Sequence, residues 1–419
     1  MTAGMSQTRK RRMPVGLRGR LLGTMAVAAA WSVGFAGAAT PGVAADVQSK
    51  QWYLSAMHSK EMWKVTTGEG IKVAVIDSGV NLSTPSLKGQ VLKGFDATGA
   101  DGDEYDDYDG HGTTMAELIA GTGKGGGLQG LAPGAKIIPF RVTDTEFQNK
   151  HSVNANDTED AIRAAADSDA RIISMSMGSD FPGRGEREAV KYAERKGKLF
   201  FAAAGNNSAK GNKEQFPAAY PQVVGVAATD STGKASEYSQ HGNNVDIAAP
   251  GNDIPHWCDE TFKGYCYGDG GTSAATAITS AAAALIWSAH PDWTANQVLN
   301  VLFDTAGRGD WKKGTLSNYL GHGIIRPAVN ILKGKGSPGA PDISPLTKEK
   351  TSGSSASPAA SAPGSSQPQK KETAGDAVVT GSSKEKDDGS SRGLIIGGAA
   401  AVVVLGGGAF VLIRKRRTA

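Results

Sequence analysis

The chain has 419 residues, with 45 Lys and Arg against 41 Asp and Glu, a formal net charge of +4 and 2 cysteines. Residues 1–45 hold six of the cations and residues 394–419 hold four, without an acid in either segment, so the remainder is net negative. The positive charge therefore gives no reason to expect a nucleic-acid partner. Composition shifts near both ends leave one long globular stretch between them.

Residues 1–45 have the pattern of an export signal. A basic start is followed by an apolar run from Leu21 to Ala39 and by small residues up to Ala45. This order of regions is typical of a secretory signal, and we expect cleavage after Ala45. The protein should then fold outside the cytoplasm.

A lead of residues 46–70 precedes the main domain, which we expect at 71–333. Six short apolar runs occur in it, at residues 71–77, 136–142, 171–178, 199–205, 223–229 and 245–251. Amphipathic stretches, for instance 157–168 and 185–197, separate several of them. Continuous apolar runs are typical of buried parallel strands joined by crossover helices. We predict an α/β fold with a mostly parallel central sheet and helices on both faces.

Polar residues at strand ends are the first candidates for a site, since ligands of such sheets bind beyond the carboxyl ends of the strands. Asp77 closes the first apolar run and Asn206 follows the fourth. His111 lies between Gly110 and Gly112, where an amphipathic helix begins. Taken singly, Asp77 could as well be a turn former or a ribose ligand as a catalytic group. A lone histidine such as His111 is usually an ordinary surface or core residue, and Asn206 would usually form a turn with Gly205.

Two segments near His111 have sequences similar to those of known ligand-binding motifs. The acidic run 101–110 could coordinate calcium, but its spacing differs from the twelve-residue calcium loop, so solvated acid near the site is the better interpretation. We further hypothesise that Asp103, Asp106 and Asp107 raise the pKa of the histidine and favour basic substrates. The run 121–126 fits GxGxxG but follows a helix instead of a strand, which predicts a helix-ending turn.

The two cysteines, Cys258 and Cys266, should form a disulfide that closes a short loop, because both are expected in an oxidising compartment. A zinc site with His256 is the alternative. It lacks a fourth ligand at metal spacing, so we predict neither a metal nor another cofactor.

Ser273 opens a stretch of small and apolar residues, 271–287, with helical spacing that should end near Pro291. A serine at this place either caps the helix or is a nucleophile presented at its end.

The last segments predict a membrane anchor. Residues 334–392 are rich in Ser, Pro, Gly and charge, which indicates a flexible stalk. Residues 393–413 are uncharged and long enough to cross a bilayer, and the cations of the tail at 414–419 should stay in the cytoplasm.

Asp77, His111, Asn206 and Ser273 together provide what nucleophilic catalysis needs. An imidazole can take the proton of a serine hydroxyl, and a carboxylate at its other nitrogen fixes its tautomer. An Asn amide and the backbone N–H at the helix start can stabilise the oxyanion.

The segments that carry these residues, "VAVIDSGV", "GHGT", "SMSMG", "AAAGNN" and "GTSAA", resemble in this order the subtilisin family of serine proteases. The resemblance implies that Asp77 orients His111, that His111 is the base and later the acid, that Ser273 is the nucleophile and that Asn206 binds the oxyanion. It also implies that Ser176, Met177 and Gly178 pair with the substrate backbone and that Gly205 borders the first side-chain pocket. The chain departs from the family at Thr114 and Ala274, where His and Met are usual.

The short lead, the cysteine loop, the stalk and the C-terminal span resemble the mycosins, membrane-anchored members of that family in type VII secretion systems. The resemblance implies polypeptide substrates among exported proteins, the secretion machinery as partner, and a single-pass protein of the cell membrane with an extracellular catalytic domain. A structural component of the secretion complex, with dispensable activity, is the alternative. An esterase of α/β-hydrolase type is disfavoured, because it requires GxSxG and an acid after the serine.

Overall fold

The computed structural model describes residues 44–351, apart from residues 152, 154–156 and 269. Residues 1–43 of the predicted export signal lie outside the described residues. So do residues 352–392 of the predicted stalk, the predicted membrane span at 393–413 and its tail.

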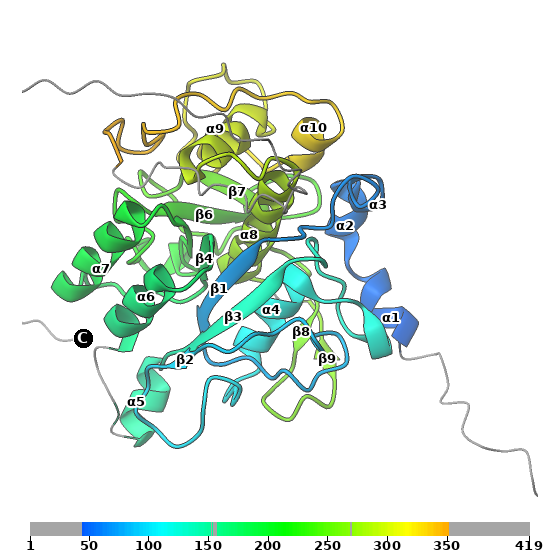
Figure 1. The fold of residues 1–419 in the computed structure, drawn as a ribbon, viewed down its shortest axis with the longest axis vertical. Helices are drawn as coiled ribbons and strands as arrows, with labels where there is room; N and C mark the ends of the chain where they lie inside the picture. The colour runs from blue at the N-terminus through cyan, green and yellow to red at the C-terminus, as the bar shows by residue number, and fades with distance from the viewer. Residues whose placement is uncertain (1–43, 152, 154–156, 269, 352–419) are drawn as a thin grey trace, which may run out of the picture. The chain divides into compact units, whose positions relative to one another are not determined.

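Seven parallel strands form the central sheet (Figure 1). In spatial order they are β2 (Phe95–Asp96), β3 (Lys136–Arg141), β1 (Lys72–Asp77), β4 (Ile172–Met175), β5 (Leu199–Ala203), β6 (Val224–Thr229) and β7 (Ile247–Pro250). The predicted parallel sheet is confirmed, and each of the six apolar runs forms a strand. The sequence pattern misses β2, because this edge strand has two residues and Phe95 is 42% exposed.

Each face of the sheet has its own apolar core, because successive side chains of a strand point to opposite faces. In β1, Val73 and Val75 belong to one core, and Ala74 and Ile76 belong to the other. Both faces are therefore covered, which explains why the strands have continuous apolar sequences instead of alternating ones.

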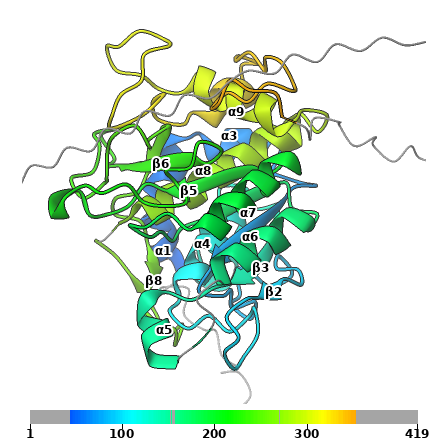
Figure 2. The same ribbon diagram turned by 90° about the vertical axis from the view of Figure 1, so that its left-hand side faces the viewer.

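Helices cover both faces, as predicted (Figures 1 and 2). The core that contains Val73 is closed by α4 (His111–Ala120), α8 (Thr272–Ala289), α9 (Ala295–Thr305) and α10 (Pro327–Ile331). The opposite core is closed by α6 (Asp157–Asp167) and α7 (Arg184–Arg195). The smaller elements are α5 (Thr145–His151), η1 (Lys124–Gly126), η2 (Ser208–Lys210) and the antiparallel pair β8 (His256–Trp257) and β9 (Tyr265–Cys266).

α8 runs through the middle of the domain against β4 to β7 and α4. Its 18 residues are apolar enough to cross a membrane, but 83% of them are buried inside the fold, so it is a core helix. The hydroxyls of Thr276 and Thr279 donate to carbonyls one turn earlier, at Thr272 and Ala275. This bonding lets these two hydroxyls be buried without loss of hydrogen bonds.

The lead, together with the last two residues of the predicted export signal, folds into α1 (Ala44–Ser49), α2 (Trp52–Ala56) and α3 (Ser59–Met62) and packs on the domain. The side-chain amide of Gln51 donates to the backbone carbonyl of Gln129 and accepts from the backbone N–H of the same residue. The Trp52 indole donates to the carbonyl of Asn252. Tyr53 is fully buried in the core.

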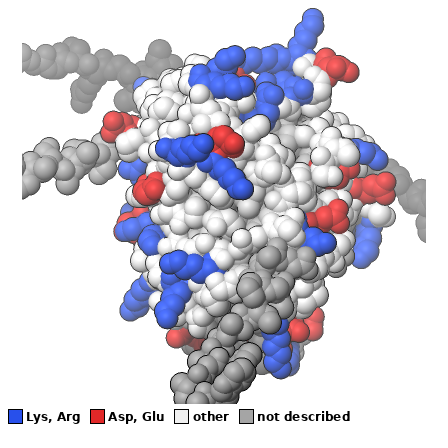
Figure 3. Space-filling view, turned by 90° about the vertical axis from the view of Figure 1, so that its right-hand side faces the viewer, with Lys and Arg blue, Asp and Glu red and all other residues white. Residues whose placement is uncertain are grey.

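On the face seen in Figure 3, Lys and Arg are interspersed with Asp and Glu around a mostly uncharged centre.

Residues 337–351, within the segment where we expect the stalk, lie against α9. Asn300 donates to the carbonyl of Pro338, and the backbone N–H of Ser337 donates to Asp304. Ser344 is buried. Polar side chains of α9 thus hold a segment that has few apolar groups of its own and that turns back on itself where the N–H of Ser344 bonds to Glu349.

Replacing Tyr53 with Ala should lower the free energy of unfolding by about 3 kcal/mol, because the lead loses its fully buried anchor and leaves a cavity. Urea unfolding followed by tryptophan fluorescence measures this. Val65→Ala, at a position 58% exposed in the same lead, is the matched control and should change stability little. Equal stability of the two variants would contradict the anchoring role.

Candidate active site

Asp77 and His111 meet at the carboxyl edge of the sheet. Asp77 is the last residue of β1, and His111 is the first residue of α4. A Cβ atom on Gly112 would lie 2.1 Å from the carbonyl oxygen of Gly79, so only glycine lets the two segments approach this closely. Gly110 precedes the helix with a φ of 86°, in the left-handed region.

The Nδ1 atom of His111 lies 2.7 Å from Oδ1 of Asp77. The carboxylate can only accept, so Nδ1 carries the proton, and Nε2 of the neutral ring is an acceptor. The backbone N–H of Ser78 also donates to Oδ1 of Asp77, at 2.9 Å. Asp77 is 1% exposed, while the His111 side chain is 32% exposed. The acid is thus enclosed, and the ring remains open to a substrate.

The pKa of His111 depends on a balance of opposing effects. Desolvation lowers it, but the Asp77 charge, the hydrogen bond to Asp77, and the charges of Asp109 and Asp107 raise it, and the resulting pKa is about 9. This lies above the ordinary value of 6.5, so protonated His111 stabilises the fold below pH 6.5, and this stabilisation is lost as the pH rises through about 9.

Ser273 is the second residue of α8, after Thr272. Its hydroxyl donates to the backbone carbonyl of Ser176 at 3.1 Å, and the Ser176 hydroxyl donates back to the carbonyl of Ser273 at 3.2 Å. Ser273, His111 and Asn206 line one hollow of about 280 Å³. The structure therefore brings these three side chains to one hollow, with the serine hydroxyl bonded to the strand end.

Asn206 is held by the start of α8. Its Oδ1 atom accepts hydrogen bonds from the backbone N–H and the hydroxyl of Thr272, both at 2.9 Å, and the Thr272 hydroxyl accepts from the N–H of Gly205 at 3.1 Å. With Oδ1 so engaged, the Nδ2 group carries the donors left for other partners. The sequence patterns do not predict this role of Thr272, although the position of Thr272 directly before the candidate nucleophile could have indicated it.

The residues predicted to pair with substrate follow β4. Ser176, Met177 and Gly178 line a second hollow of about 560 Å³ that His111 also borders. Gly205 directly precedes Asn206 and has a φ of 111°. A Cβ atom added to Gly205 would collide with the side chain of Gln240. None of residues 47–70, the part of the lead whose side chains the structure describes, lines either hollow.

The acids of the run 101–110 differ in environment. Asp103 and Asp106 are exposed and accept hydrogen bonds from backbone N–H groups of their own loop. Asp107 is buried, and Asp109 lines both hollows beside His111. The charges that raise the pKa of His111 therefore include Asp107 and Asp109, which refines the hypothesis drawn from the sequence. Within residues 44–351 as described, no group of three or more His, Cys, Asp or Glu could hold a metal ion.

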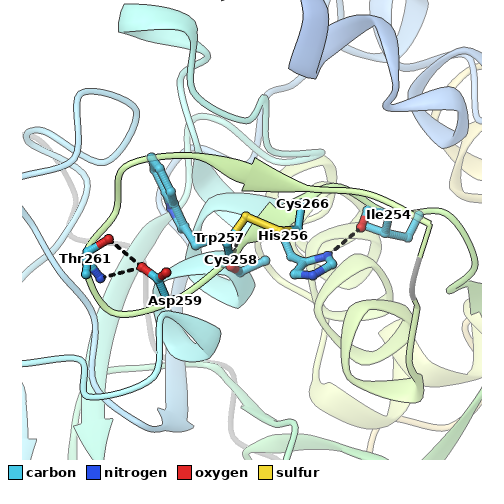
Figure 4. The surroundings of a disulfide bond; sticks show 8 residues. Ile254, His256, Trp257, Cys258, Asp259, Thr261 and Cys266 are labelled. Carbon is cyan, nitrogen blue, oxygen red and sulfur yellow. Dashed lines mark hydrogen bonds between the residues drawn. A yellow bond between two sulfur atoms is a disulfide. The ribbon is translucent and has the colours of Figure 1, made fainter.

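The disulfide joins Cys258, directly after β8, to Cys266 of β9 (Figure 4). Cys258 also lines the smaller hollow. His256 bonds through Nδ1 to the carbonyl of Ile254, at 3.2 Å. On the other face of the hairpin, the rings of Trp257 and Tyr265 stack at 3.9 Å, and the Tyr265 hydroxyl donates to Glu117 of α4 at 2.7 Å. The hairpin is thereby fixed to the helix that begins at His111.

The family model described as Peptidase S8, subtilase family, matches residues 68–323. The chain belongs to the subtilase family and is a serine protease. Thermitase from Thermoactinomyces vulgaris is 34% identical over 278 residues, which cover 65% of this chain and 95% of thermitase. Subtilisin E from Bacillus subtilis is 36% identical over 243 residues, which cover 57% of this chain and 61% of subtilisin E.

Solved structures of type VII secretion proteases are also similar. The MycP3 protease from the type VII (ESX-3) secretion system is 31% identical, with a TM-score of 0.56 over 67% of this chain and 87% of that one. MycP1 from Mycobacterium smegmatis is 27% identical, with a TM-score of 0.58 over 71% and 88%. The resemblance to subtilisins and mycosins inferred from the motifs is confirmed.

We predict that kcat/KM for peptide hydrolysis rises with pH up to about 9, because a base must be neutral to accept a proton and the pKa of His111 is about 9. Asp109→Asn should move this rise to lower pH, since it removes one of the charges that raise that pKa. The exposed Asp103→Asn is the control and should leave the profile in place. A profile unmoved by Asp109→Asn would contradict this assignment.

Proposed function

We propose that this serine protease is a membrane-anchored, extracellular endopeptidase that cleaves through Asp77, His111 and Ser273 and acts in type VII protein secretion. The observation that carries the catalytic part is the 2.7 Å hydrogen bond between His111 and Asp77, at the border of a hollow that Ser273 also lines.

In the proposed reaction, Nε2 of His111 takes the hydroxyl proton of Ser273 while Oγ attacks the peptide carbonyl. The amine then leaves with that proton, and an acyl-enzyme remains. Water repeats the sequence, with His111 again as base and then as acid. Asp77 keeps Nδ1 protonated and stabilises the imidazolium, for which its buried carboxylate is well suited.

The oxyanion would be bound by Nδ2 of Asn206 and by the backbone N–H of Ser273. The first N–H groups of a helix have no partner within it, so the N–H of Ser273 in the first turn of α8 is available. The two bonds from Thr272 fix the amide plane of Asn206 before substrate binds. Such preorganised donors are worth most where the charge develops in the transition state.

The substrate backbone would add as a strand along Ser176, Met177 and Gly178, which follow β4 and line the larger hollow. Side chains of the substrate on the acyl side would then enter a hollow in which acids outnumber the single Arg184: Asp109, Asp144, Asp157, Glu159 and Glu186. This composition supports the preference for basic substrates that we hypothesise from the sequence.

The role in secretion rests on two kinds of support. Proteases named for type VII secretion systems share the fold over two thirds of this chain. The sequence also predicts an export signal, a stalk and a C-terminal span, which would hold the catalytic domain outside the membrane beside a secretion complex. Exported proteins are the substrates we propose, and the secretion machinery is the partner.

Ser273→Ala should abolish both peptide hydrolysis and labelling by a serine-directed fluorophosphonate, because the nucleophile is lost. The wild-type protein, incubated with a peptide library and the probe, should cleave peptides and be labelled at Ser273, which mass spectrometry of the tryptic peptide checks. Labelling at another serine would contradict the proposed nucleophile.

Asn206→Ala should lower kcat about 10²- to 10³-fold with little change in KM, since it removes one oxyanion donor. Asn207→Ala, an exposed neighbour, is the matched control and should retain wild-type kcat. A comparable loss in both variants would indicate a disturbed loop instead of a missing donor.

A scaffold with dispensable activity is the second candidate. The observation in its favour is that the Ser273 hydroxyl is bonded to the carbonyl of Ser176 and not to His111. Ser273→Ala in cells separates the two functions. Normal secretion by this variant would support the scaffold, and arrested secretion with wild-type protein levels would support the protease.

A further inference from the structure

Asp107 is a buried carboxylate that the proposed reaction does not use. It is 7% exposed and lies in the loop before α4. Its two oxygens accept hydrogen bonds from the Ser78 hydroxyl at 2.7 Å, the N–H of Asp109 at 3.1 Å, the N–H of Gly110 at 2.8 Å, and the N–H and hydroxyl of Thr113 at 2.8 and 2.6 Å.

These donors come from both segments of the proposed catalytic pair. Ser78 directly follows Asp77, and its hydroxyl also accepts from the N–H of Gly112 at 3.0 Å. Gly110 and Thr113 flank His111 on either side. The carboxylate thus links the end of β1 to the first turn of α4, on both sides of the histidine.

Asp107 also completes the start of α4. Gly110, the residue before this helix, has no side chain to bond the free N–H groups of the first turn. Oδ2 of Asp107 takes the N–H of Thr113 in that role. Asp103 and Asp106 bond backbone groups of their own exposed loop, so a turn-forming role explains them but not Asp107.

We propose that Asp107 is a positioning residue, which holds the backbone around His111 at a fixed place relative to Asp77. This inference rests on the proposed function, because it assigns the residue a role through His111. A carboxylate suits the task, since its two oxygens accept from several donors at once. Asparagine has the same shape but only one oxygen, so one set of donors would face an amide NH₂.

Asp107 also affects His111 electrostatically, because its negative charge favours the imidazolium. The other ionisable groups around His111 are Asp77 at the end of β1, Asp109 in the same loop and those that line the two hollows: Asp144, Asp157, Glu159, Arg184, Glu186 and His256. Apart from Asp77 itself, none of these groups bonds both the segment of Asp77 and the segment of His111, whereas Asp107 does.

The test compares Asp107→Asn with Asp103→Asn in the full chain, purified in mild detergent. We expect Asp107→Asn to lower kcat at least about tenfold at nearly unchanged KM, because small misplacements of a catalytic group slow chemistry more than binding. The alkaline rise of kcat/KM should move to lower pH. Asp103→Asn should match the wild type in kcat, KM and pH profile.

A matched pair at Thr113 covers the case in which Asp107→Asn does not fold. Thr113→Ser keeps the hydroxyl that donates to Asp107 and should keep most of the activity. Thr113→Val has the same shape without that hydroxyl and should lose kcat to a similar degree as Asp107→Asn. Thermal unfolding of every variant separates loss of activity from loss of fold.

The outcomes distinguish this inference from the proposed function. If the wild-type chain is neither active nor labelled by a fluorophosphonate, the proposed function fails and the inference fails with it. If the wild type is active and Asp107→Asn is folded, with wild-type kcat and an unmoved pH profile, the positioning role alone is overturned. Equal kcat for Thr113→Ser and Thr113→Val would overturn it as well.

Discussion

The hydrogen bond between His111 and Asp77 is the contact on which the rest of the site depends. It joins the end of β1 to the start of α4 over 34 residues of sequence, at 2.7 Å. The sheet order makes it possible, because β1 lies between β3 and β4 and its carboxyl end opens beside the helix that packs on α8. A residue at Gly112 with any side chain would push the two segments apart. The motif "GHGT" is thus a steric requirement as much as a chemical one.

Burial of two carboxylates near one imidazole requires compensation. Asp77 and Asp107 are 1% and 7% exposed, and an unpaired buried charge would be strongly destabilising. Backbone N–H groups and hydroxyls from Ser78 and Thr113 supply it at Oδ1 of Asp77 and at both oxygens of Asp107, while Oδ2 of Asp77 has no hydrogen-bond partner among the described residues. The loop before α4 thus folds around its acids. The same negative charges outweigh desolvation at His111 and raise its pKa to about 9. The same buried acids therefore organise the loop before α4 and set the pKa of His111.

The sequence predicts the scaffold well and the side-chain directions poorly. Apolar runs predict six strands, because strands buried on both faces have continuous apolar sequences, and the spacing of 271–287 predicts α8. The strand ends also predict which residues gather: Asp77, His111, Asn206 and Ser273 do lie at one edge. Composition predicts an acidic loop, but not that Asp107 is enclosed while Asp103 is exposed, since that depends on how the loop closes. The hydroxyl of Thr272 and the partner of the Ser273 hydroxyl likewise follow from tertiary distances that no local pattern encodes.

The reciprocal bonds between Ser176 and Ser273 have a consequence for the enzyme at rest. In the substrate arrangement proposed above, a peptide along the strand end would offer its amide to the carbonyl of Ser176, which accepts the Ser273 hydroxyl in this structure. Because a carbonyl oxygen has two lone pairs, it can accept from both donors, and the Ser273 hydroxyl would give up this bond only when it turns toward His111. The bond to Ser176 therefore defines the position from which the proposed nucleophile would have to rotate before it could react.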